Sequence, residues 1–246
     1  MKLQSPSSGA IDLAVMPARG GSVRVPRKNV RDFGGQPMLH WPLRTVIESG
    51  CFDRVVVSTD DEEIASIATR SGAEVPFSRP PTLADDHTGT RAVLRHAVAW
   101  WHQEVGPTRY VACVYPTAAF LSVDAVRSAF ELLDTDPALD CAVTVAAYPH
   151  PIERALLVDD HGRLRQRQPG HETTRTQDVR PAYFDVGQLY LWRSEALLDE
   201  GREAQRAAVH VPRWRAFDID DEDDWRLAES VFIASVDKLR PRRDRG

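Results

Sequence analysis

The sequence has few cysteines and no long apolar run, and both absences narrow the class of protein. The three cysteines, Cys51, Cys113 and Cys141, are an odd number without the spacing of a metal site. Cys113 and Cys141 lie within apolar runs, so we expect small core residues in a reducing compartment. No run approaches the ~18 apolar residues of a membrane span, and residues 1–9 lack the apolar segment of a signal peptide. We therefore expect a cytoplasmic protein with no membrane partner.

The sequence also lacks an excess of positive charge. Its 31 lysines and arginines against 36 aspartates and glutamates give a formal net charge of −5, so we expect no nucleic-acid partner. Cationic residues gather instead at 19–31, 163–180 and 238–245. Such local concentration favours a small anionic ligand. The last group belongs to a basic tail, residues 237–246, which we expect to be solvated.

Apolar segments alternate with amphipathic ones along most of the 246 residues, which are enough for one α/β core. The expected strands are residues 11–16, 54–58, 73–77, 110–115, 140–146, 183–192 and 215–220. The expected helices are residues 39–48, 92–101, 123–133, 194–198 and 222–236, with a further one capped by Asp60. This order predicts a single domain, residues 1–246, with a Rossmann-like, mainly parallel sheet and helices on both faces.

The alternation stops between residues 148 and 180, a stretch rich in Arg, Gln, His and Pro. Only Leu156-Leu157-Val158 favours a strand there, followed by a turn at Asp160-His161-Gly162. Two interpretations fit this stretch: a disordered insert, or an ordered arm that packs on a partner subunit.

The loop after the first strand has the composition of a phosphate site. Gly20-Gly21 lets phosphate oxygens approach the backbone N–H groups closely. The cations beside it are Arg19, Arg24, Arg27 and Lys28. The loop matches neither the P-loop spacing nor the dinucleotide fingerprint, so a merely solvated loop is the alternative. Its place directly after a buried strand favours ligand binding, and the residues predict a nucleoside triphosphate site.

Two carboxylates near the other end of the chain would complete such a site. Asp218 and Asp220 are two residues apart, and on a strand both side chains point to one face. Such a pair at the end of a strand would hold one or two Mg²⁺ ions against phosphate oxygens. The alternative is that Asp220 caps the helix after it, which leaves Asp218 unexplained.

Several other polar residues follow expected strands and are candidate ligand contacts. Arg79, on a stiff segment before two prolines, would recognise a base edge or a carboxylate. Tyr115 and Thr117 lie at the carboxyl end of a strand, although Tyr115 also suits a core position. His87, next to two acids, is a candidate base, but a lone loop histidine is more often solvent-exposed.

A set of motifs between residues 12 and 230 is typical of one enzyme family. It begins with Pro17-Ala18-Arg19-Gly20-Gly21-Ser22 and Pro26-Arg27-Lys28-Asn29. It continues in order through residues 58–65, 72–77, 79–80, 83–90 and 185–188, and ends at Asp218-Ile219-Asp220. This set resembles the cytidylyltransferases that activate nonulosonic (sialic-type) sugar acids. Within that family, Tyr115-Pro116-Thr117-Ala118 and Gly187-Gln188 resemble the pseudaminic acid cytidylyltransferases most.

The resemblance implies a nucleotidyltransferase-type fold that transfers CMP from CTP to the sugar acid, with Mg²⁺ as cofactor and pyrophosphate as second product. The implied nucleotide-binding residues are Arg19, Gly20, Gly21, Ser22, Arg24, Arg27, Lys28, Asn29 and Arg79. The implied metal ligands are Asp218 and Asp220, which with Arg19 form the catalytic set. The implied sugar contacts are Tyr115, Thr117, Asp185 and Gln188. The family is usually a homodimer in which each subunit lends an arm, and residues 148–180 match that role.

Two positions depart from the family pattern. Val23 stands where lysine is common, so either Arg24 supplies the missing cation or turnover is reduced, and Ala119 stands where proline is common. Legionaminic and N-acetylneuraminic acid are alternative sugars to pseudaminic acid. A nucleotide-binding protein without turnover and a glycosyltransferase that consumes a nucleotide sugar are the alternative classes.

Overall fold

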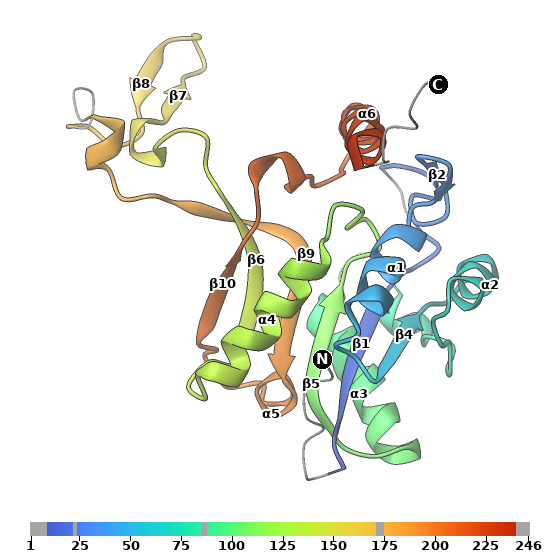
Figure 1. The fold of residues 1–246 in the computed structure, drawn as a ribbon. Coiled ribbons are helices and arrows are strands. Elements are labelled where there is room, and N and C mark those ends of the chain that lie inside the picture. Colours follow the sequence, from blue (N-terminus) through green and yellow to red (C-terminus); the bar gives the residue numbers. More distant parts are fainter. Residues whose placement is uncertain (1–8, 22–23, 85–87, 171–174, 240–246) are drawn as a thin grey trace, which may run out of the picture.

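A six-stranded sheet forms the centre of the molecule, in the strand order β10-β6-β9-β5-β1-β4 (Figure 1). The structure is a computed structural model, and it describes residues 9–21, 24–84, 88–170 and 175–239. The strands are β1 (Ile11–Pro17), β4 (Arg54–Ser58), β5 (Thr108–Val114), β6 (Cys141–Ala147), β9 (Tyr183–Arg193) and β10 (Arg206–His210). The helices are α1 (His40–Ser49), α2 (Glu62–Arg70), α3 (Thr90–Glu104), α4 (Val123–Thr135), α5 (Ser194–Leu198) and α6 (Glu222–Leu239).

The sheet is mainly parallel, as the alternation of strands and helices predicts. β1 pairs in parallel with β4 and β5, and β10 pairs in parallel with β6. β9 lies between β5 and β6 and is antiparallel to both. The start of β9 therefore lies at the same edge of the sheet as the carboxyl ends of its two neighbours.

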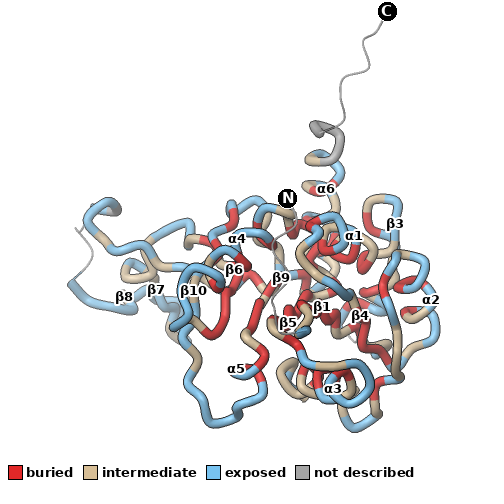
Figure 2. Tube along the Cα trace, turned by 60° about the horizontal axis from the view of Figure 1, so that its bottom comes forward, coloured by how far each residue is buried: buried red, intermediate tan, exposed pale blue. Residues whose placement is uncertain are grey.

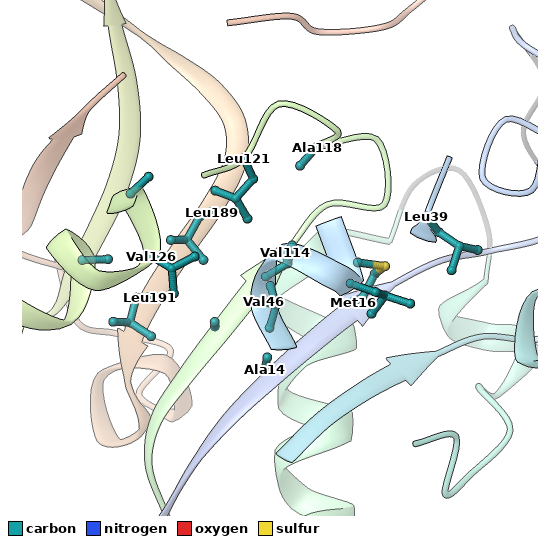
Figure 3. Packing of buried hydrophobic residues seen from close by; sticks show 14 of the residues in the cluster. Ala14, Met16, Leu39, Val46, Val114, Ala118, Leu121, Val126, Leu189 and Leu191 are labelled. Carbon is teal, nitrogen blue, oxygen red and sulfur yellow. The ribbon is translucent and has the colours of Figure 1, made fainter. Parts of the chain in front are cut away.

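Separate apolar clusters bury the two faces of the sheet, because residues alternate between faces along each strand. On one face, side chains of β1, β5 and β9 pack against α1 and α4 (Figure 3). Residues of α2 belong to the same cluster. On the other face, Leu13 and Val15 of β1 pack with residues of α3 and with Leu197 of α5. Cys113 and Cys141 are buried and unpaired, which confirms them as small core residues. The buried residues follow the sheet in Figure 2, and most of the exposed ones lie around it.

A third cluster lies beyond the carboxyl ends of β1 and β5, and we call it the α6 cluster. Its buried members are Val25, Phe33, Met38, Ala119, Phe120, Ile219, Trp225, Ala228 and Phe232. Phe33 contacts both Trp225 and Phe232, with each pair of ring centroids 5.2 Å apart. Phe217 stacks on Phe120 at 4.8 Å. The cluster therefore joins the first loop, the loop after β5 and residues 217–219 to one helix.

The expected strand at residues 215–220 is wrong. The chain forms a short 3-10 helix, η4 (Arg213–Arg215), and the residues after it do not pair with the sheet. Phe217 and Ile219 pack in the α6 cluster, and acids follow each of them. This alternation of apolar and acidic residues has the same two-residue period as a strand. The edge strand is instead β10, whose exposed Arg206, Ala208 and His210 leave no apolar alternation to detect.

Two smaller expectations also change. The helix cap is Asp61 rather than Asp60, since its carboxylate accepts a hydrogen bond from the Ile64 N–H at 2.9 Å. Residues 73–77 form no strand, because only isolated bridges join Val56 to Glu74 and Thr59 to Ser78. The apolar stripe of this helix is confirmed, with Ile64, Ile67 and Ala68 buried.

Residues 148–180 include ordered structure that projects away from the sheet (Figure 1). Two short strands, β7 (Leu156–Val158) and β8 (Leu164–Gln166), pair as an antiparallel hairpin. Short 3-10 helices, η2 (Ile152–Arg154) and η3 (Thr176–Asp178), flank it. The remaining small elements are β2 (Asp32–Phe33), β3 (Gln36–Pro37) and η1 (Pro81–Leu83). Within the described residues, no helix has both the length and the apolar character needed to cross a membrane.

We expect Trp225→Ala to lower the free energy of unfolding by about 3–5 kcal/mol, because it removes the largest fully buried side chain of the α6 cluster. Denaturant unfolding measures the change. Leu227→Ala is the matched control on the same helix, since Leu227 is 59% exposed and should change stability by less than about 0.5 kcal/mol. Equal effects of the two substitutions would contradict the role given to the cluster.

Candidate active site

A cavity of about 290 Å³ opens where β1 and β5 end. Its cationic lining residues are Arg19, Arg24, Lys28 and Arg79. Its polar neutral lining residues are Asn29, Thr88, Thr90, Tyr115 and Thr117. The sequence predicts all of these as ligand contacts except Thr88 and Thr90. One cavity therefore receives both nucleotide-binding and sugar-binding candidates.

The acid segment, residues 217–220, lies against the cationic loop, residues 19–29. The Lys28 ammonium donates to the Ile219 carbonyl at 2.5 Å, and an Arg24 guanidinium nitrogen lies 2.8 Å from a carboxylate oxygen of Asp220. Ile219 is buried while Asp218 is exposed, so the two acids flank a residue that anchors them. The cationic loop and the acid segment thus meet although residues 215–220 do not form the expected strand.

Asp220 does not cap α6. The carboxylate that accepts from the first backbone N–H groups of this helix belongs to Asp221, which bonds Asp223 and Asp224 at 2.9 Å each. The capping alternative for Asp220 is therefore wrong, and its carboxylate meets Arg24 instead.

The ionisable groups of this region shift one another's pKa. Burial lowers the pKa of the Lys28 ammonium, while the carboxylates of Asp220 and Asp218 counteract the shift. Partial desolvation and then the repulsion of Asp220 raise the pKa of Asp218, against the effect of Lys28 and Arg24. The segment therefore holds two carboxylates whose charges repel each other beside a cation that burial disfavours.

Two residues of the cavity are held rigidly by backbone and side-chain partners. Arg79 is 4% exposed, and its guanidinium donates to the hydroxyl of Ser58 at 3.1 Å and to the Ser58 carbonyl. Burial lowers its pKa. The side-chain amide of Asn29 donates to the Arg19 carbonyl at 3.0 Å, which fixes the start of the loop.

The remaining loop candidates are placed differently. The Gly20 N–H donates to a carboxylate oxygen of Asp60 at 3.1 Å. Gly21 is exposed, and Ser22 lies outside the described residues, as do Val23 and His87. Arg27 does not line the cavity; its guanidinium pairs with Asp61 and Glu63 at the start of α2.

A second cavity, of about 570 Å³, adjoins the first and shares Thr90 and Tyr115 with it. These two side chains are joined by a hydroxyl–hydroxyl hydrogen bond of 2.9 Å. Tyr190 and Trp192 of β9 form an aromatic wall of the second cavity. The Tyr190 ring meets the Tyr115 ring edge-on, with centroids 5.7 Å apart.

The other two residues expected to contact the sugar, Asp185 and Gln188, form hydrogen bonds with other residues of the protein. Both carboxylate oxygens of Asp185 accept from the Tyr190 hydroxyl at 2.8 Å, and this interaction contributes to a raised pKa of that hydroxyl, which burial raises most. Gln188 is 1% exposed, and its side-chain amide donates to the Arg215 carbonyl at 2.6 Å. Gln188 therefore ties the segment that precedes the acids to β9.

Sequence reasoning missed the aromatic wall and the acids at the start of α2. Tyr190 and Trp192 are two residues apart in an expected strand, and that spacing alone would have placed them on one face. The partners of Arg27 are 34 and 36 residues away in the chain, so no local pattern reveals them.

The sequence matches a family of known enzymes. A profile of the family described as cytidylyltransferase matches residues 13–191. The pseudaminic acid cytidylyltransferase of Campylobacter jejuni is 34% identical over 224 residues, which cover 90% of this chain and 96% of that protein. The CMP-N,N'-diacetyllegionaminic acid synthase of Legionella pneumophila is 26% identical and covers 92% of this chain and 98% of its own length. The N-acylneuraminate cytidylyltransferase of Escherichia coli is 25% identical over 89% of this chain and 51% of that protein.

Solved structures share the fold. The CMP:2-keto-3-deoxy-manno-octonic acid synthetase complexed with CTP superposes with a TM-score of 0.67 at 17% identity, over 91% of this chain and 99% of that one. This likeness shows a nucleotidyltransferase-like α/β fold. The match over residues 13–191 and the 34% identical relative together establish that the chain belongs to the cytidylyltransferase family of nucleotidyltransferases.

Proposed function

We propose that this cytidylyltransferase transfers CMP from CTP to the anomeric hydroxyl of a nonulosonic acid sugar and releases pyrophosphate. The observation that carries the proposal is the pair of contacts Arg24–Asp220 and Lys28–Ile219, which join the cationic loop to the acid segment beside one cavity. A triphosphate requires cations and a divalent metal ion requires carboxylates. This region offers both kinds of side chain next to each other.

The choice of sugar rests on the relatives. The three described above are named for pseudaminic, diacetyllegionaminic and N-acylneuraminic acid. The relative named for pseudaminic acid has the higher identity, 34% against 26% and 25%. Pseudaminic acid is therefore the substrate that we test first, with CMP-pseudaminic acid as the product.

In the proposed complex the cationic loop holds the triphosphate. Arg19, Arg24 and Lys28 neutralise its charge, and Arg24 supplies the cation that is missing at Val23. Asn29 keeps Arg19 in place through the Arg19 carbonyl. Arg79, fixed by Ser58, binds the cytosine in the same cavity.

The acid segment has the donor chemistry of a Mg²⁺ site. In the described part of the chain, no group of three or more His, Cys, Asp or Glu side chains has the arrangement to hold a metal ion by itself. Mg²⁺ typically needs only one or two carboxylates beside water and phosphate oxygens. The negative charge of Asp220 contributes to the raised pKa of Asp218, and a bound cation would offset the repulsion between the two carboxylates. Asp218 and Asp220 would hold this ion, which supplies charge stabilisation and lowers the pKa of a bound hydroxyl.

The proposed reaction is an in-line substitution at the α-phosphorus. The anomeric oxygen bonds to phosphorus while the bond to the pyrophosphate oxygen breaks, and the hydroxyl proton passes to solvent. Arg19 and Lys28 stabilise the charge that grows on the departing pyrophosphate. The chain thus contributes positioning and charge, and this scheme assigns no proton to His87.

The second cavity gives the sugar a place beside the nucleotide. Tyr115 lines both cavities, and Thr117 lines the first one. Tyr190, held by Asp185, and Trp192 offer ring faces to the apolar parts of the sugar. Arg91 lies over the Trp192 ring at 4.8 Å, and its Nε has no hydrogen-bond partner among the described residues.

The hairpin of β7 and β8 is the proposed contact with a second copy of the chain. Its apolar side chains are exposed: Leu156 50%, Leu157 37%, Val158 67% and Leu164 66%. A hairpin of this size cannot bury such side chains by itself, and a homodimer would cover them.

We expect CTP, Mg²⁺ and pseudaminic acid to release pyrophosphate and form the CMP-sugar, measured by a coupled pyrophosphate assay and mass spectrometry. Legionaminic and N-acetylneuraminic acid are the comparison sugars, and faster turnover of either would reassign the substrate within the proposed reaction. Binding of CTP without release on any sugar would favour a nucleotide-binding protein. Consumption of a nucleotide sugar instead of CTP would favour a glycosyltransferase.

We expect Asp218→Asn to reduce turnover at least about a hundredfold while making the unliganded protein slightly more stable at neutral pH. A carboxyl group whose folded-state pKa is raised loses stability on ionising, so the free energy of unfolding falls as pH rises from the ordinary carboxyl pKa through the raised one. The variant lacks this contribution. The gain should stay below about 1 kcal/mol because the side chain is exposed and screened.

Denaturant unfolding at pH 3 to 8 and the pyrophosphate assay measure these two effects. Asp223→Asn is the matched control, since this exposed acid lies three residues beyond Asp220 and faces solvent. Full turnover in Asp218→Asn would remove the metal assignment.

We expect the double substitution Val158→Glu with Leu164→Glu to convert a dimer into a monomer, because charges on the hairpin cannot be buried between two copies. Light scattering after size exclusion measures the mass. Leu227→Glu, on an equally exposed leucine of α6, should leave the dimer intact. A wild-type chain that stays monomeric at about 100 μM would refute the contact.

A further inference from the structure

Three acids at the start of α2 have no place in the proposed reaction, yet they contact the cationic loop. Asp60 and Asp61 lie two and three residues after the end of β4 at Ser58, and Glu63 lies in the first turn of α2. None of the three lines the cavity of about 290 Å³. Their partners are Gly20 and Arg27, which stand near the two ends of the loop.

Arg27 is turned toward these acids instead of toward the cavity. One guanidinium nitrogen lies 2.5 Å from Asp61 Oδ2, and the other lies 3.3 Å from Asp61 Oδ1 and also donates to Glu63. Its backbone has φ 55°, and it is the single non-glycine residue with positive φ in the described ranges. Such a conformation costs free energy in an arginine, so the surrounding contacts must stabilise it.

Gly20 approaches the same acids from the other end of the loop. Its N–H bonds to Asp60, and a Cβ at this position would lie 2.7 Å from a carboxylate oxygen of Asp61. A larger residue would therefore push the loop away from α2. The two contacts hold the loop at residues 20 and 27, on either side of Arg24 and directly before Lys28.

The acids themselves are fixed in place. The Asp61 carboxylate also caps α2 through the Ile64 N–H, and the Asp61 N–H donates to the Thr59 hydroxyl at 3.1 Å. The carbonyl of Thr59 accepts from the Arg79 N–H at 2.8 Å. One turn after β4 thus supports both the cationic loop and Arg79, which line the same cavity.

We propose that Asp61 and Arg27 are positioning residues that hold the cationic loop in its triphosphate-binding conformation, and that Arg27 does not bind phosphate. The proposal rests on the proposed function, in which this loop binds CTP. Four cations lie within ten residues and repel one another, so the loop alone would favour extended conformations. Pairing Arg27 with two acids removes one of these charges and orders the loop before the nucleotide arrives.

The test is a double-substitution cycle of Arg27→Asn and Asp61→Asn. Asparagine tolerates positive φ and is a good helix cap, so each change removes the ion pair and keeps the local backbone. We expect each single variant to weaken CTP binding with Mg²⁺ about tenfold by calorimetry. The double variant should be no weaker than either single one, because both changes remove the same interaction. At saturating CTP, kcat should change less than about threefold, since bound triphosphate orders the loop.

Glu62→Gln is the matched control, an exposed acid in the same turn, and its CTP affinity should equal that of the wild type. Additive losses of about a hundredfold in the double variant would overturn the proposal and return Arg27 to a phosphate contact. Arg27→Gly, which relieves the positive φ, should lose the same affinity if the asparagine variant fails to fold. If the wild-type chain does not bind CTP, the proposed function fails, and this proposal fails with it.

Discussion

The packing of three loops on α6 is the constraint on which the site depends. The cations of the first loop come from residues 19–29, the two acids come from residues 217–220, and the loop after β5 adds Tyr115 and Thr117. None of these segments lies within the sheet. Val25, Phe120 and Ile219 bring the three segments together in one apolar cluster. Burial of Ile219 also determines where its neighbours point, because the two acids on either side are left facing the cations. Apolar packing thus sets an electrostatic arrangement that like charges would otherwise oppose.

Several cations of the first loop have acid partners before any ligand binds. Arg24 meets Asp220, Arg27 meets Asp61, and Arg31 meets Glu222 at 2.5 Å. The first of these pairs is exposed on both sides, 68% and 44%, so water screens it and its net contribution to stability is small. A phosphate can therefore replace the Asp220 carboxylate on Arg24 at little cost. The pairs farther from the cavity involve the elements that support the loop, and nothing in the proposed reaction requires them to open.

Local periodicity predicted the elements whose apolar residues face a helix, such as β4, α4 and the stripe of α2. Local periodicity failed for two segments. Residues 217–219 alternate between apolar and acidic because their apolar side chains pack in the α6 cluster, and the edge strand β10 shows hardly any apolar alternation. The convergence of Arg19, Lys28 and Asp218 followed from family resemblance and chemistry, although the expected strand was wrong. The orientation of Arg27 depends on partners in another element, so its charge and the family resemblance predicted a phosphate contact and gave no sign of its pairing with Asp61 and Glu63.

The reversed direction of β9 has a consequence for how this protein tolerates change. Ala147 at the end of β6 pairs directly with Tyr183 at the start of β9, so the projecting stretch between them leaves and rejoins the sheet at neighbouring residues. Because Ala147 and Tyr183 are paired, the length of the stretch between them can change without a shift in the register of the sheet. Evolution could lengthen, shorten or exchange the hairpin without moving Tyr190 or Gln188. The projecting hairpin and the chemistry of this enzyme can therefore diversify independently of each other.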